Sequence, residues 1–167
     1  IKELCKREYV LPEEVNKENE TKTVIEKTNV AQGNLNIGMK VNNISKDDVA
    51  KVAVYNAVLG GGANSKLFQN VREKASLAYS AGSMFIKTKK TIIIKCGIDP
   101  ENYEKTLKIV NKQLDDMKNG DFSEEDMNKA KELIVASCKS MQDEQDSELR
   151  KWMKNGILNS YLNMVQT

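Results

Sequence analysis

Residues 59–83 read LGGGANSKLFQNVREKASLAYSAGS, and this stretch predicts two changes of secondary structure in close succession. The three glycines at 60–62 predict the end of a preceding helix, because glycine tolerates the left-handed conformation that a helix exit needs. Asn64 and Ser65 predict the N-terminal cap of a short second helix. A strand is expected over residues 77–86, so the stretch predicts a helix-to-helix hinge followed by a helix-to-strand connection.

The residues before this stretch predict two strands and a longer helix. Residues 34–41 alternate between polar and apolar side chains, which is typical of a half-buried strand. Residues 21–27 are rich in β-branched side chains and predict another strand. Ser45 and Asp48 have the spacing of a capping box, so we expect a helix to start there and to continue to Leu59.

A β-hairpin and a long helix are expected next. The strand over 77–86 and a second strand over 91–98 are separated only by the sequence KTKK, which is short enough for a hairpin. Asp99 and Pro100 then predict the N-cap and the first turn of a helix, since proline suits the first helical position. The chain is therefore expected to pass directly from the hairpin into a helix.

The rest of the chain predicts only helices. Ser123 and Asp126 form a second potential capping box, and an apolar stripe follows it as far as Met141. A last helix is expected around Trp152, which we interpret as a core residue. Helices grouped after a largely antiparallel sheet predict an α+β fold, a two-layer sandwich with the helices on one face. The buried helical positions that we expect are Leu107, Val110, Leu114 and Ile134.

Length and composition favour a single globular domain. The chain has 167 residues, of which 40% are hydrophobic and 30% are charged, and these values exclude a disordered tail. Residues 1–20 are polar and contain Pro12, so we interpret them as a linker or approach segment. One domain is then expected over residues 21–167.

The charge and hydropathy patterns argue against two kinds of partner, and the cysteines indicate the redox environment. The net charge is +2 and lysines alternate with carboxylates, so we expect no nucleic-acid partner. No membrane partner is expected either, because no stretch approaches the ~20 apolar residues that span a bilayer. Cys5, Cys96 and Cys138 are odd in number and far apart, which favours free thiols in a reducing cytoplasm.

Histidine is absent from the sequence, and this excludes the common hydrolytic sites. Hydrolytic zinc sites use His ligands with Glu as the general base, and three dispersed cysteines do not replace them. A Ser-His or Cys-His nucleophile is excluded for the same reason. A phosphate-binding loop is excluded because the glycines follow a helix and the order Ser65-Lys66 reverses that of the Walker motif.

The stretch quoted first resembles the signature of the second homologous domain in pitrilysin-type (insulinase-like) zinc peptidases, which include the mitochondrial processing peptidase. In that family the pattern GGG-x-x-S-x-L-F-x-x-x-R-E-K-x-x-L-A-Y joins a short helix to a strand, and residues 60–79 match it. Gln32-Gly33 before a strand also looks like the family's layout. The resemblance covers about residues 23–162 and implies the processing-peptidase fold. It also implies terminal helices beyond Thr167, so we expect a C-terminally incomplete domain.

The resemblance further implies substrate-binding roles for two residues. In the family, a domain bearing His-x-x-Glu-His pairs with a second domain of similar fold, and together they enclose a chamber for unfolded peptides. The second domain contributes an Arg and a Tyr beside the zinc, and these positions match Arg72 and Tyr79. Both side chains are hydrogen-bond donors that can polarise a scissile carbonyl. The resemblance thus implies a peptide substrate, no cofactor in this chain, and zinc in a catalytic homologous domain or subunit.

Alternatives stay open for the two residues and for the parent protein. Without the resemblance, Arg72 is explained by a salt bridge to a local carboxylate and Tyr79 by a half-buried place in a sheet. The parent is expected to be a zinc metalloendopeptidase, or else a non-enzymatic scaffold or protein-binding subunit of the same origin. In both cases we expect no hydrolysis by this chain alone, because it lacks the metal motif.

Overall fold

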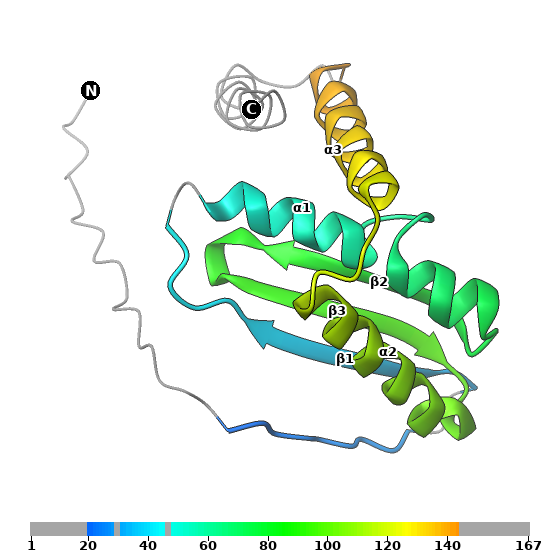
Figure 1. Cartoon of the computed structure of the whole chain (residues 1–167). Helices are drawn as coiled ribbons and strands as arrows, with labels where there is room; N and C mark the ends of the chain where they lie inside the picture. The colour runs from blue at the N-terminus through cyan, green and yellow to red at the C-terminus, as the bar shows by residue number, and fades with distance from the viewer. Residues whose placement is uncertain (1–19, 29–30, 46–47, 144–167) are drawn as a thin grey trace, which may run out of the picture.

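A three-stranded antiparallel sheet lies at the centre of the described part of the chain (Figure 1). The structure is a computed structural model that describes residues 20–28, 31–45 and 48–143. The helix expected around Trp152, and the expected linker apart from Glu20, lie outside these residues. The elements are, in chain order, β1 (Gly33–Lys40), α1 (Asp48–Gly60), η1 (Phe68–Lys74), β2 (Ala78–Ile86), η2 (Lys87–Lys89), β3 (Thr91–Ile98), η3 (Pro100–Asn102), α2 (Tyr103–Lys118) and α3 (Glu124–Asp143).

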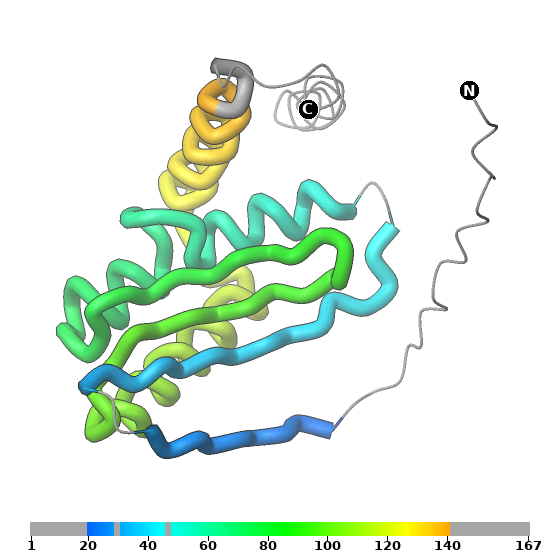
Figure 2. Tube along the Cα trace, turned by 180° about the vertical axis from the view of Figure 1, so that it is seen from behind, coloured from blue at the N-terminus to red at the C-terminus, as the bar shows by residue number. Residues whose placement is uncertain are grey.

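The sheet has the strand order β1-β3-β2, and both pairings are antiparallel. One face of the sheet is apolar: Cys96 of β3 lies opposite Leu35 of β1 and Ala81 of β2, and all three residues are buried. The helices α1 and α2 cover this face, whereas no described helix covers the strands when they are seen from behind (Figure 2). The predicted two-layer α+β architecture is confirmed.

The local signals at the hairpin and at two helix starts act as expected. The turn between β2 and β3 is the short 3-10 helix η2, which Lys90 ends in the left-handed conformation with φ +46°. At the start of α1, the Asp48 backbone N–H donates to Ser45 Oγ (3.3 Å) and Ser45 Oγ donates to Asp48 Oδ2 (2.6 Å). Ser123 and Asp126 make the same pair of contacts before α3, so both predicted capping boxes are confirmed.

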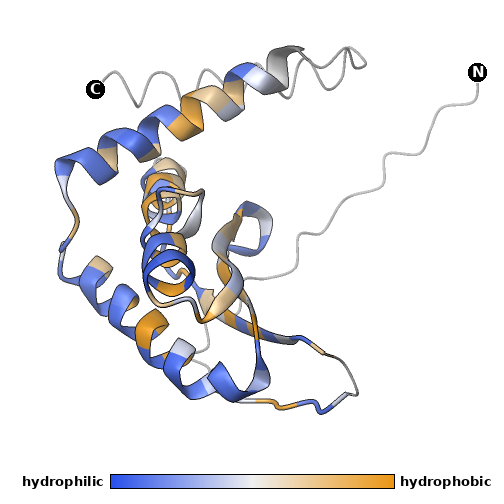
Figure 3. Cartoon of the chain, turned by 90° about the vertical axis from the view of Figure 1, so that its right-hand side faces the viewer, coloured by the Kyte–Doolittle hydropathy of each residue, from blue (hydrophilic) through white to orange (hydrophobic). Residues whose placement is uncertain are grey.

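The helix α3 packs mainly against α1 and extends from the helical layer away from the sheet (Figure 1). Its first half is hydrophilic, and an apolar band follows in its middle (Figure 3). Ile134 was expected to be buried and is only half-buried, since α3 packs mainly on a single helix, α1. Among the described helices, none combines the length and the apolar composition that crossing a membrane requires.

The buried face of α2 differs from the predicted one. Val110 is fully buried as expected, but Leu107 and Leu114 are only half-buried. Thr106 and Gln113 are buried in their place, since the helix presents this flank to η1. The burial of Gln113 is compensated by a hydrogen bond, because Asn70 Nδ2 of η1 donates to Gln113 Oε1 at 2.8 Å. Apolar periodicity alone could not predict this pairing of Asn70 with Gln113, because both side chains are polar.

The strand predicted over residues 21–27 is wrong. Residues 20–28 have no regular secondary structure and run along the β1 side of the sheet, apart from it, in both Figures 1 and 2. Val24 and Ile25 are 86% and 71% exposed. β-Branched residues favour an extended backbone, but a strand also needs a hydrogen-bonded neighbour. The described residues supply none to this segment.

The reason predicted for the three glycines is also wrong. Glycine was expected at 60–62 for a left-handed helix exit, yet Gly120 is the described glycine with a positive φ (+75°). Gly60 is instead needed for close approach: a Cβ there would collide with Ser83 N and lie 2.8 Å from the carbonyl carbon of Gly82. A Cβ on Gly61 would lie 2.7 Å from Ala57 Cα. Gly60 therefore lets α1 pack directly on the backbone of β2, and Gly61 lets the chain turn closely over the last turn of α1.

Candidate functional site

Arg72 lies on η1, which is a π-helical turn wider than an ordinary helix. Leu67 and Val71 are fully buried and anchor the turn to the core. Helical residues begin at Lys66, just before η1, and the Phe68 backbone N–H donates to Ser65 Oγ (3.4 Å), so Ser65 caps the start of this helical stretch as predicted. The sequence predicted a short helix here, but it carries no signal for the π-helical geometry, which is rare and often found near functional sites.

The Arg72 side chain is exposed and held by two neighbours of its own helix. Its guanidinium carbon lies 4.6 Å from the centroid of the Phe68 ring, within the range of a cation–π contact. Its Nε lies 3.8 Å from Glu73 Oε1, a long and exposed ion pair that contributes little stability. In the described residues the terminal NH groups of Arg72 make no hydrogen bond, so they can bind a ligand.

Ser76 ends η1 and directs the chain into β2. Its φ is +52°, a left-handed conformation that is uncommon for a residue other than glycine. The Ser76 N–H donates to the carbonyl of Arg72 and the Leu77 N–H donates to that of Val71, both at 3.1 Å. Such paired bonds close helix ends in general. They fix the path of the short connection between Arg72 and Tyr79.

Tyr79 occupies a β-bulge at the start of β2. Ala78 lies opposite Ile98 and Ser80 lies opposite Gly97, so Tyr79 is the extra residue between the two pairs. Bulges bend a strand and redirect its side chains, and they are frequent near active sites. The Tyr79 side chain is accordingly 61% exposed, although it belongs to a strand with a buried face. Its hydroxyl donates to Asp99 Oδ1 at 2.8 Å.

Asp99 changes the chemistry of the Tyr79 phenol. The hydrogen bond to Asp99, together with the negative charge of that carboxylate, raises the pKa of Tyr79. A phenol is protonated at neutral pH, and here its proton is directed at Asp99. Asp99 has the N-cap position before η3, as predicted, but its side chain makes no capping hydrogen bond.

Polar groups from three segments lie together at this end of the sheet. The Gly97 backbone N–H donates to Ser80 Oγ at 3.3 Å. A Cβ on Gly97 would meet Gln32 Nε2 and would lie 3.0 Å from Ser80 Oγ, so the side chains of Gln32 and Ser80 both lie close to the Gly97 backbone. Sequence reasoning missed Ser80 and Asp99 as site residues, and it had no signal for the bulge at Tyr79 or for the contact with Asp99, 20 positions later.

Arg72 and Tyr79 thus lie on consecutive elements, both with exposed side chains, and each has its own partners. The half-buried position considered for Tyr79 is wrong, and the local salt bridge considered for Arg72 is present only as a long pair with Glu73. The substrate-binding role that the resemblance implies for the two residues in a shared peptide chamber stays a prediction.

Comparison with known proteins identifies the family. The family model described as the peptidase M16 inactive domain matches residues 6–134, which is more than half of the chain. The chain belongs to the peptidase M16 family. The resemblance of residues 60–79 to zinc peptidases of this kind is therefore confirmed.

Two curated relatives of this M16 domain come from Bacillus subtilis (strain 168). The protein named "Probable inactive metalloprotease YmfF" is 44% identical over 114 residues, which are 68% of this chain and 27% of the relative. "Uncharacterized zinc protease YmxG" is 25% identical over 140 residues, which are 83% of this chain and 34% of the relative. The chain thus spans about a third or less of the length of either relative.

Two solved structures share the fold of the M16 domain. A conserved protein from Enterococcus faecalis V583 has a TM-score of 0.67 and 28% identity, over 79% of this chain and 31% of that one. A peptidase M16 inactive domain from Pseudomonas fluorescens has a TM-score of 0.64 and 24% identity, over 81% of this chain and 34% of the other. The similarity supports the α+β assignment.

The M16 domain described here has no donor set that fits the family's zinc. No group of three or more Cys, Asp or Glu side chains in residues 20–28, 31–45 and 48–143 could hold a metal ion, and the sequence has no histidine. Cys96 and Cys138 are buried and unpaired by disulfides. Burial raises the pKa of the Cys96 thiol to about 11, so it is a poor source of thiolate at neutral pH. The candidate site is therefore a site for hydrogen bonding and charge.

Proposed function

We propose that this M16 inactive domain forms one wall of a peptide-binding chamber in a zinc metalloendopeptidase. A homologous domain or subunit with the metal motif forms the other wall and supplies the zinc. The observation that carries the proposal is the exposure of Arg72 and Tyr79 on two elements that each reach the core through a buried residue, Val71 in η1 and Ala81 in β2. Polar side chains that are held rigidly yet left accessible are typical of binding sites.

The chemistry of Arg72 suits an unfolded peptide. An extended peptide presents backbone carbonyl oxygens that a folded protein has already used in hydrogen bonds. The Arg72 guanidinium is a permanent cation with several N–H donors, and stacking on Phe68 limits its freedom before a ligand binds. It can therefore donate to a peptide carbonyl near the partner's zinc, where negative charge develops during hydrolysis.

A second candidate function is that of a non-catalytic scaffold or binding subunit. The name of YmfF describes that relative as a probable inactive metalloprotease, and it is 44% identical to this chain. The name of YmxG describes a zinc protease instead. The two candidates differ in one measurable property, because a scaffold does not need Arg72 and Tyr79 for turnover.

Kinetics on the assembled protein test the proposal. The full-length protein is combined with the domain or subunit that carries the metal motif, and kcat/KM is measured for a quenched fluorogenic peptide derived from β-casein. We expect Arg72→Ala to lower kcat/KM by about 100-fold, as the loss of a donor to a developing oxyanion does. Tyr79→Phe should lower it as well.

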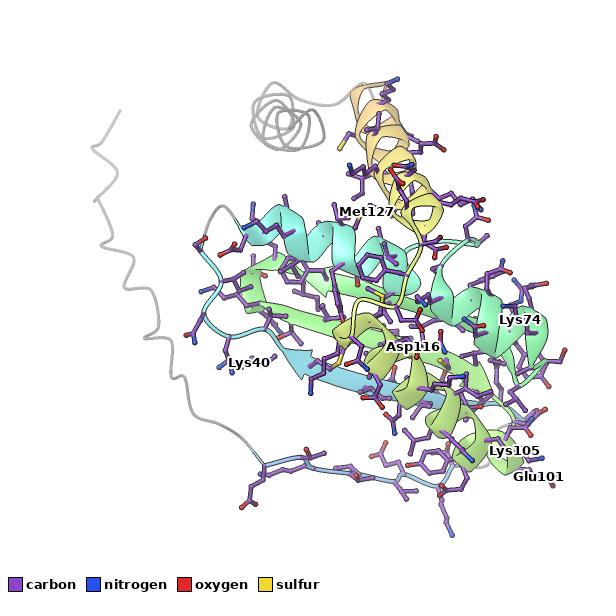
Figure 4. The ribbon with its side chains drawn as sticks, in the orientation of Figure 1. Lys40, Lys74, Glu101, Lys105, Asp116 and Met127 are labelled. Carbon is purple, nitrogen blue, oxygen red and sulfur yellow. The ribbon has the colours of Figure 1, made fainter. Side chains whose placement is uncertain are left out.

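Lys74→Ala is the matched control, since it removes a positive charge from the same turn η1 (Figure 4). It should leave kcat/KM close to the wild-type value. Wild-type kcat/KM in both the Arg72 and the Tyr79 variants, with assembly verified by gel filtration, would reject the chamber role and favour the scaffold.

A further inference from the structure

Asp99 is the N-cap residue of η3, but its side chain does not cap that helix. It precedes η3 with an extended backbone (φ −73°, ψ 138°), as an N-cap residue does. An N-cap aspartate usually accepts a hydrogen bond from a backbone N–H of the first turn, but Asp99 makes no such bond. Its Oδ1 instead accepts from the Tyr79 hydroxyl, from a residue 20 positions earlier.

The bulge and Asp99 together determine the direction of the Tyr79 hydroxyl. The register shift between Ala78 and Ser80 displaces Tyr79 from the regular alternation of β2 and brings it beside the end of β3. The ring is 61% exposed, so the core does not hold it. In the described residues, the 2.8 Å bond to Asp99 is the polar contact that orients the side chain.

A phenol has a single proton, and this limits what it can offer a ligand. When the proton is donated to a carboxylate, the phenol oxygen has only lone pairs left for a further group. The hydrogen bond to an ionised acceptor also increases the electron density on that oxygen. A donor role toward a peptide carbonyl would require the bond to Asp99 to break first, which leaves a carboxylate without its partner.

We propose that Asp99 is a positioning residue for Tyr79: it holds the phenol at the bulge and presents its oxygen as a hydrogen-bond acceptor for a peptide N–H group. This inference rests on the chamber role proposed above. It complements the role of Arg72, because an extended peptide offers both kinds of backbone group. Arg72 donates to a peptide carbonyl, and Tyr79 accepts from a peptide N–H.

Nuclear magnetic resonance tests the pairing without any activity. The chain is labelled with ¹³Cζ-tyrosine, and the Tyr79 signal is assigned by its loss in Tyr79→Phe. We expect the pKa of Tyr79 to fall in Asp99→Asn and to stay high in Glu101→Gln. Glu101 is a matched control, because it is an exposed carboxylate in η3, two residues away and at the N-terminal end of α2 (Figure 4). An unchanged pKa in Asp99→Asn would overturn the inference.

Kinetics of the assembled protein with the β-casein peptide test the acceptor role. A contact made in the ground state affects KM, so Tyr79→Phe and Asp99→Ala should each raise KM about fivefold, the equivalent of one ordinary hydrogen bond, with little change in kcat. Alanine is used at position 99 because the amide oxygen of asparagine would still accept from the Tyr79 hydroxyl. The double variant should be no worse than Tyr79→Phe alone, because both changes remove one interaction.

Each other outcome rejects a different claim. A fall in kcat at unchanged KM in Tyr79→Phe would make Tyr79 a donor in the transition state, which overturns the acceptor role and leaves the chamber role standing. Wild-type kinetics in the Tyr79, Asp99 and Arg72 variants alike would reject the chamber role, and this inference with it.

Discussion

At the scale of single residues, the absence of a side chain at Gly60 allows α1 to pack closely on β2. The last turn of α1 approaches the backbone of β2 at Gly82 and Ser83. Ser83 Oγ also donates to Asn56 Oδ1 at 2.9 Å, so the two elements are joined by a hydrogen bond beside the close approach. The contact fixes α1 over the strand that carries Tyr79.

The first prediction therefore concerns Gly60. We expect Gly60→Ala to lower the free energy of unfolding by about 2–3 kcal/mol, because the new Cβ overlaps backbone atoms that cannot move independently. Gly38→Ala is the matched control: its Cβ would meet nothing within 4 Å, and a change within about 0.5 kcal/mol is expected. Urea denaturation followed by circular dichroism measures both. Equal effects at the two positions would contradict the close-packing explanation.

At the scale of the elements, the start of α1 depends on a capping box whose strength varies with pH. The hydrogen bond from the Ser45 side chain, assisted by Lys51, lowers the pKa of Asp48 from 3.8 to about 2. A lowered pKa in the folded state means that the ionised carboxylate stabilises the fold. This contribution is present above the ordinary pKa of Asp48, and it is lost as the pH falls through the folded value.

The second prediction follows from the lowered pKa of Asp48. Acidification from about pH 5 to about pH 2 should reduce the stability of the wild type more than that of Asp48→Asn. The variant has no carboxylate at the cap, so its acid sensitivity comes from other groups only. Asp115→Asn, which removes an exposed carboxylate from the interior of α2, should keep the wild-type acid sensitivity. Midpoints of urea denaturation, measured across this pH range, provide the test. Identical acid sensitivity in Asp48→Asn and the wild type would refute the stabilising role of the ionised Asp48 carboxylate.

At the scale of the whole molecule, the sheet has one face covered by helices and one face without a described helix (Figure 2). Arg72 and Tyr79 lie near the same end of β2, one before the strand and one at its beginning. The molecule therefore carries these two exposed side chains at one end of the sheet. This arrangement suits a domain that contributes contacts to a site shared with a partner.

The third prediction is that the chain alone holds no stoichiometric zinc and does not cleave the β-casein peptide. It has no histidine, and two of its three thiols are buried in the fold. Elemental analysis of protein purified without chelators, together with a peptide-cleavage assay, provides the test. One tightly bound zinc per chain would show that the assignment as a metal-free domain is incorrect.

The sequence alone was sufficient for features that depend on residues close together in the chain. The strands around Leu35 and Ile94, the two capping boxes and the Ser65 cap all arise from side chains within a few positions of one another. The signature over residues 60–79 was sufficient for the family and for the choice of Arg72 and Tyr79 as candidates. Alternation and capping are local physics, so a linear reading detects them.

Only the tertiary structure decided the features that depend on which surfaces meet. The pairing of Tyr79 with Asp99 needs a register shift between two strands, and the burial of Gln113 needs Asn70 on another helix. The same holds for residues 21–27, whose β-branched side chains favour extension without supplying a neighbouring strand. The sequence predicted that a helix ends near Gly60, but glycine is needed there because the backbone of β2 lies close to it. Contacts between distant residues are set by packing, and no local pattern specifies them.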